Sequence, residues 1–119
     1  MSRFSGADPS QPIGAVATAN TNGVSGACSG GSDTAAYAVN LTTSAANAFV
    51  YSAVGIRRKS HSAGAGFTEI DEIHGGSGGS TAGVATQGMA AETPGAQTVN
   101  GSVSSSVDWG VVALEIQPL

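Results

Sequence analysis

Residues 49–56 read Phe-Val-Tyr-Ser-Ala-Val-Gly-Ile, and this stretch indicates the fold more clearly than any other part of the chain. Side chains of a β-strand point alternately to opposite faces, so the stretch divides into two sets. The sets are Phe49, Tyr51, Ala53 and Gly55 on one face and Val50, Ser52, Val54 and Ile56 on the other. Both sets are mainly apolar, which is typical of a central strand with both faces covered.

A second apolar run, residues 107–116, is stopped by Pro118 and predicts the last strand of the fold. Its alternation places Val112, Leu114 and Ile116 on one face, which we expect to be the core face. The opposite face carries Trp109, Val111, Ala113 and Glu115. Because this second face combines an aromatic ring with a carboxylate, we expect it to meet solvent or another chain.

Outward from these two runs, strand-like segments alternate with Gly, Ser, Asn and Pro, and helical periodicity is almost missing. The segments are 13–19, 24–28, 36–42, 48–57, 67–74, 82–91, 97–104 and 109–116. Asn100-Gly101 is in addition predicted to form a tight turn. About eight short strands predict an all-β fold, an antiparallel, jelly-roll-like β-sandwich. Residues 1–119 would form it as a single domain, or as the second half of a larger one.

Small residues dominate the composition. The chain has 18 Gly, 20 Ala, 16 Ser and 10 Thr, whereas Val, Ile, Leu and Phe together supply 22 residues. Burial of apolar surface stabilises a fold by about 25 cal/mol per Å², so this chain has a thin core for its length. We therefore expect a homo-oligomer, or a domain that is completed by strands of a parent protein.

Charge and hydropathy exclude several classes of protein. Four Lys and Arg residues and a net charge of −4 exclude a general nucleic-acid-binding protein, which needs a basic surface. The chain has no run of about 18 apolar residues, so we expect no membrane insertion. Residues 1–6 lack the apolar region of a secretion signal. The single cysteine, Cys28, excludes an internal disulfide framework, and we expect it to be a small buried hydrophobic residue.

Three stretches carry a resemblance to a known family: residues 4–14 (FSGADPSQPIG), 64–70 (GAGFTEI) and 108–118 (DWGVVALEIQP). In order and spacing they resemble the C-terminal half of a Gly/Ser/Thr-rich β-sandwich domain of secreted bacterial surface proteins and phage structural proteins. The family usually has Val where this chain has Ala7. The resemblance implies a role in surface architecture or adhesion, without shared catalytic residues. It also implies that the strands preceding the first stretch come from a longer chain or from partner subunits.

Residues suited to catalysis are few. Residues 75–79, Gly-Gly-Ser-Gly-Gly, match the G-x-S-x-G pattern of a nucleophile elbow, but no helix is predicted after them, so we expect a loop. His61 and His74 are the candidate general bases, and the sequence shows no partner pattern for either. No loop carries the several oxygen ligands of a calcium site. We expect a non-catalytic protein with no metal and no cofactor.

Five residues are candidates for binding a partner, namely Trp109, Asp108, Tyr51, Arg57 and Arg58. An exposed ring of Trp109 or Tyr51 with Asp108 nearby would suit the face of a sugar, although a lone Trp is more often part of a core or an interface. The two arginines would suit a phosphate, a sulfated glycan or an acidic partner. Alternatively, they pair with the acidic run 69–72 across a hairpin.

These patterns favour a structural or adhesive surface module that associates with copies of itself. We expect such a module outside the cell or on a virion surface. The alternative is a small jelly-roll carbohydrate-binding module, which requires an exposed aromatic ring in a concave face.

Overall fold

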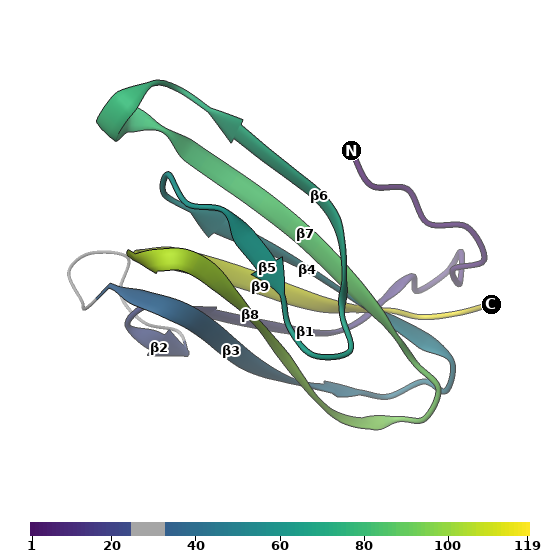
Figure 1. Ribbon diagram of the computed structural model, residues 1–119. Helices are drawn as coiled ribbons and strands as arrows, with labels where there is room; N and C mark the ends of the chain where they lie inside the picture. Colours follow the sequence, from purple (N-terminus) through teal and green to yellow (C-terminus); the bar gives the residue numbers. More distant parts are fainter. Residues whose placement is uncertain (25–32) are drawn as a thin grey trace.

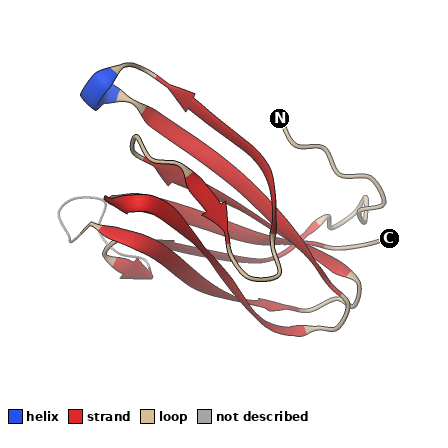
Figure 2. Cartoon of the chain, viewed as in Figure 1, coloured by secondary structure: helices blue, strands red, loops and turns tan. Residues whose placement is uncertain are grey.

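The computed structural model describes residues 1–24 and 33–119, and this part of the chain is almost entirely β-structure (Figure 2). Its strands are β1 (Ile13–Asn20), β2 (Gly23–Val24), β3 (Thr34–Thr43), β4 (Ala48–Ile56), β5 (His61–Ala63), β6 (Thr68–Gly75), β7 (Ala82–Ala91), β8 (Gly95–Val107) and β9 (Trp109–Ile116). One short 3-10 turn, η1 (Gly78–Ser80), joins β6 to β7. The predicted all-β fold is confirmed. Most of the predicted segment 24–28, including Cys28, lies outside the described residues.

Two antiparallel sheets pack face to face and form a β-sandwich (Figure 1). The larger sheet has the strand order β2-β1-β9-β4-β7-β6, and the smaller has the order β3-β8-β5. Strands that follow each other in sequence, such as β3 and β4, often lie in different sheets. The interior between the sheets is built mainly from valine and alanine, with Leu41, Ile56, Tyr37 and Phe67 as the larger members.

The strand predicted from residues 49–56 is central, because β4 pairs with β7 on one side and with β9 on the other. Its inward side chains, Val50, Ser52, Val54 and Ile56, are buried. Its other face is only partly covered: Tyr51 is half-buried and Gly55 is exposed. The prediction that both faces are covered was therefore wrong, since the smaller sheet shields one side of the larger sheet only.

The predicted orientation of β9 was also wrong. Val111 and Ala113 are buried, whereas Val112 is 44% exposed. Glu115, expected to meet solvent or another chain, is fully buried. Its carboxylate can be buried because it accepts hydrogen bonds from the backbone N–H groups of Ala15, Ser44 and Ala45 at 2.8–2.9 Å.

The structure differs from the sequence-based expectations in three local features. Asn100-Gly101 is not a turn but lies inside β8, paired with Ala38 and Tyr37 of β3. Strand β5 was not predicted; its three residues pair with β8 in the smaller sheet. Because β5 intervenes and β6 pairs with β7, the basic residues after β4 do not face residues 69–72 across a hairpin.

Both ends of the described chain lie at the same end of the sandwich (Figure 1). Ala7 forms an antiparallel bridge with Pro118, and the N–H of Leu119 donates to the carbonyl of Gly6 at 2.9 Å. Residues 1–6 form no strand and lie beside the larger sheet. This segment is called the N-terminal segment below.

Candidate functional site

The side of the larger sheet that faces away from the smaller sheet is an open apolar surface, called the outer face here. Its exposed members include Val16, Ile70, Ile73, Val84 and Val112, which are 42–57% exposed. The registers place Val16 in a row with Leu114 and Tyr51, and Val84 opposite Ile73, whereas Val112 lies between Thr18 and Ala53. In a monomeric protein an apolar patch of this kind marks an interaction site.

The outer face carries almost no charge. Among the outward positions of the described strands in this sheet, Asp71 on β6 is the charged residue. The neighbouring carboxylates of Glu69 and Glu72 lie on the inner side of the sheet, where they pair with His61 and His74. Small residues, such as Ala53 and Thr86, fill the middle rows. The face thus carries little charge.

The N-terminal segment covers one end of the outer face. The ring of Phe4 packs at 5.9 Å from the ring of Phe49 and edge-on at 5.2 Å from Tyr51. The hydroxyl of Ser2 is 2.8 Å from that of Tyr51. The ring of Phe49 lies over Gly88, where a Cβ atom would overlap it. Tyr51, a predicted binding residue, is therefore part of an aromatic cluster beneath this segment.

Three other predicted residues come together at the far end of β4 and β9. Arg57, Asp108 and Trp109 line an open depression of about 340 Å³ together with several glycines. Trp109 is half-buried: its ring packs 5.7 Å from that of Tyr37, and its Nε1–H donates to Thr34 Oγ1 at 2.6 Å. One part of the indole is therefore anchored in the core, which is where a lone Trp is often found.

Each polar residue of this depression also has a partner inside the chain. Asp108 accepts a hydrogen bond from Thr21 at 3.0 Å, and Arg57 donates to the carbonyl of Gly79 at 3.0 Å. Arg58, with a φ of 53°, does not line the depression. Tyr51 points to the opposite face of the sheet from Trp109. The five predicted residues therefore do not form one site.

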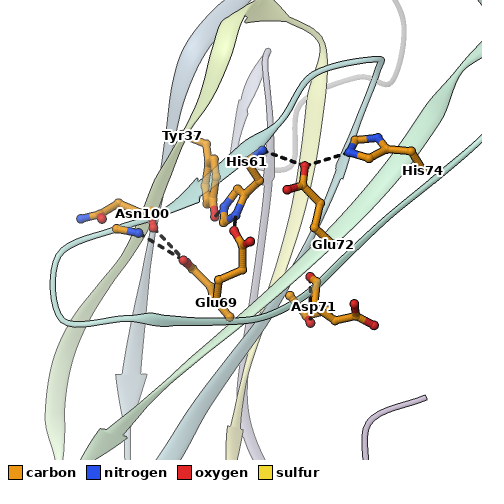
Figure 3. A network of polar contacts seen from close by, with 10 residues as sticks. Tyr37, His61, Glu69, Asp71, Glu72, His74 and Asn100 are labelled. Carbon is orange, nitrogen blue, oxygen red and sulfur yellow. Dashed lines mark hydrogen bonds and ion pairs between the residues drawn. The ribbon is translucent and has the colours of Figure 1, made fainter.

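A polar network that the sequence did not reveal joins the two sheets at β5 and β6 (Figure 3). His61 on β5 contacts Tyr37 Oη through Nε2 at 2.8 Å and Glu69 through Nδ1. Burial, with the charge of Glu69 adding to it, raises the pKa of Tyr37, so its hydroxyl stays protonated and can donate to Nε2. The Nδ1–H of His61 then donates to Glu69.

Glu72 extends the network along β6. It accepts a hydrogen bond from the backbone N–H of His61 at 2.8 Å and lies 2.8 Å from Nε2 of His74. The alternation of β6 is the signal that could have identified these residues, since Glu72 and His74 are two residues apart and share one face. The partner strand β5 was not predicted, so their convergence on His61 was not visible.

The network resembles the order of groups in an acid–histidine–hydroxyl relay, but its central residue is closed off. The side chain of His61 has no exposed surface, and both ring nitrogens are occupied. A substrate would have to displace Tyr37 or Glu69 to reach the imidazole. These contacts link β5 to Tyr37 of β3 and to Glu69 and Glu72 of β6.

Within residues 1–24 and 33–119, no group of three His, Cys, Asp or Glu side chains is arranged to hold a metal ion. In the same part of the chain no helix has the length and apolar character needed to cross a membrane. Comparison with protein-family models, with curated proteins and with solved structures gives no match to this chain.

Proposed function

We propose that this protein is a non-catalytic structural module that associates with a second copy of itself through the outer face. The observation that carries this proposal is the exposed, largely apolar and nearly uncharged surface that β1, β9, β4, β7 and β6 present. Apolar patches of that kind stabilise association when they are withdrawn from water.

The area of the outer face approaches that of a standard dimer interface. Five strands about 4.8 Å apart, each about eight residues long at about 3.3 Å per residue, span roughly 600 Å² in projection. A standard protein interface buries about 800 Å² on each partner. The outer face can therefore supply most of such an interface.

The charge of the molecule favours a second copy as the occupant. The chain has a net charge of −4, so most of its surface repels another copy. The outer face largely lacks that repulsion, because Asp71 is the one charged residue at the outward positions of its described strands. The resemblance of residues 4–14, 64–70 and 108–118 to a surface-protein domain supports a structural or adhesive role outside the cell or on a virion.

Sedimentation velocity over a range of protein concentrations tests this function. Wild-type protein is expected to sediment as a dimer at high concentration, and Val112→Asp or Val84→Asp is expected to remain monomeric. Val24→Asp is the matched control: Val24 is 74% exposed but pairs with the inward residue Ala19, so it lies off the outer face. A wild-type monomer at all concentrations, or equal dissociation of all three variants, would contradict the proposal.

The depression formed by Arg57, Asp108 and Trp109 supports a second candidate function, the binding of a glycan. Its volume of about 340 Å³ lies at the lower end of the range for small-ligand sites. A glycan array tests it: Asp108→Asn and Arg57→Gln should lower the signal, whereas Arg58→Gln, outside the depression, should not. Binding that is unchanged in the first two variants would eliminate this candidate.

A further inference from the structure

A cleft of about 590 Å³ lies between the N-terminal segment and the end of the outer face that it covers. Phe49, Ile70 and Ile116 contribute its lining from the strands, and Phe4 contributes from the segment. Small-molecule sites usually have volumes of about 300–1000 Å³ and mainly apolar walls with a few polar groups. The volume of the cleft and its apolar walls agree with these values.

Two residues of opposite charge also line the cleft, Arg3 from the segment and Asp71 from β6. Figure 3 shows the Asp71 carboxylate apart from the histidine network, with no bond drawn to it. Its backbone carbonyl accepts a hydrogen bond from Thr86, and that bond leaves the carboxylate available. Within the part of the chain that the structure describes, the ion pairs involve His61 and His74, so neither Arg3 nor Asp71 has an ion-pair partner.

We propose that this cleft binds a small zwitterion with an apolar side chain, such as an amino acid or a dipeptide. The ligand's carboxylate would pair with the guanidinium of Arg3, whose planar donor groups match a carboxylate. Its ammonium group would pair with Asp71. Its apolar side chain would lie against Phe4, Phe49 and Ile70.

Other ligand classes fit the cleft less well. A purely apolar ligand would exclude water from Arg3 and Asp71 without replacing their hydration, which costs free energy. A simple anion or cation would satisfy one of the two charges, be repelled by the other and leave the apolar walls uncovered. A zwitterion with an apolar side chain satisfies both charges and covers the walls.

This site can be tested separately from the self-association proposed above, although Ile70 and Asp71 belong to both the cleft and the outer face. It lies at the end of the outer face that the N-terminal segment already covers, and it needs one copy of the chain. Val112 and Val84, whose variants test self-association, do not line the cleft. Failure of one proposal therefore leaves the other standing.

Isothermal titration calorimetry with the dipeptide leucyl-phenylalanine tests the proposal. The unmodified dipeptide is expected to bind, and N-acetylation or C-terminal amidation should each lower the affinity at least tenfold. Asp71→Asn should weaken binding of the unmodified dipeptide, and N-acetylation should then cause no further loss of affinity. Arg3→Gln should also weaken binding of the unmodified dipeptide, and C-terminal amidation should then cause no further loss of affinity. Both residues are exposed, so we expect both variants to fold, and circular dichroism verifies this.

Asp33→Asn and Arg58→Gln are the matched controls, because these exposed residues carry the same charges but do not line the cleft. They should bind the dipeptide as wild type does. The proposal is overturned if the unmodified dipeptide does not bind at millimolar concentration. It is also overturned if the acetylated and amidated forms bind as tightly as the unmodified one.

Discussion

Glu115 is a buried carboxylate that the fold stabilises with hydrogen-bond donors. Burial alone would raise its pKa, but the backbone N–H groups of Ala15, Ala45 and Ser44 and the Ser44 hydroxyl outweigh burial and hold the pKa below its usual range. These donors come from β1 and from the turn after β3, so one side chain connects three parts of the chain. Gly14 makes room for it, since a Cβ atom there would overlap the carboxylate.

Glu115→Gln should destabilise the fold by about 3 kcal/mol, because an amide N–H₂ group would face backbone N–H groups and leave buried donors unpaired. A depressed pKa means that the carboxylate's contribution is present above its unfolded value, near 4.5, and is lost as the pH falls through the folded pKa. Urea denaturation should therefore show a difference between wild type and variant that is full at pH 7 and shrinks below about pH 4.5. Glu92→Gln, at an exposed glutamate, should change little.

Two glycines of the larger sheet give a matched pair of substitutions. Gly88→Ala places a Cβ atom in the ring of Phe49, so the ring must move and the fold should lose about 1–3 kcal/mol. Gly110→Ala meets no atom within 4 Å and should be neutral or stabilising by about 0.5 kcal/mol. Thermal unfolding of both variants measures the difference. Equal effects would show that Phe49 does not rest on Gly88.

At the scale of elements, β5 is a three-residue strand whose position depends on the network around His61. Its pairing with β8 covers His61, Ser62 and Ala63 only, so side chains must supply much of its stability. His61→Ala removes the links to Tyr37 and Glu69 and should cost about 2–3 kcal/mol. Amide hydrogen exchange in β5 should accelerate.

His74→Ala is the control for that prediction. The side chain of His74 is 34% exposed and has one polar partner, Glu72, so its removal should cost less than about 1 kcal/mol. Exchange in β5 should then stay close to wild type. If both variants accelerate exchange equally, Glu72 rather than the Tyr37–His61–Glu69 contacts holds the strand.

The sequence predicted the strands well and their faces less well. The ranges 48–57, 82–91 and 109–116 agree closely with β4, β7 and β9, because apolar runs bounded by turn residues report strand position directly. The face of β9 was wrong because Val112 and Leu114 offer more apolar area than Val111 and Ala113. The donors that permit burial of Glu115 lie 70–100 residues away in sequence, where no local pattern shows them.

The candidate sites were predictable only in part. Trp109, Asp108 and Arg57 do line one depression, because residues at adjacent strand ends meet when the strands pair. The outer face was not predicted, because the apolar residues on both faces of β4 were interpreted as a strand with both faces covered. Whether a second layer covers a sheet depends on how the chain distributes strands between the layers, and six strands here face three.

At the scale of the whole molecule, the fold exposes more surface than its mass requires. Its accessible area is 6417 Å², whereas a monomer of 11.5 kDa is expected to expose about 5800 Å². Its radius of gyration of 14.4 Å also exceeds the value of about 13.5 Å expected for 119 residues. The molecule is elongated, with extents of 44 × 25 × 24 Å, and the uncovered outer face is part of its exposed surface.

A second copy on the outer face would couple the stability of this molecule to its concentration. For a folded dimer that dissociates on unfolding, each tenfold rise in concentration adds about 1.4 kcal/mol, which raises Tm by about 3–5 °C for a unit of this size. Differential scanning calorimetry at 10-fold steps of concentration should show this rise for wild type and for Val24→Asp. Val112→Asp should unfold at one temperature throughout, since its charge on the outer face prevents pairing. A wild-type Tm that is independent of concentration would mean that the core between the two sheets stabilises the fold without a partner.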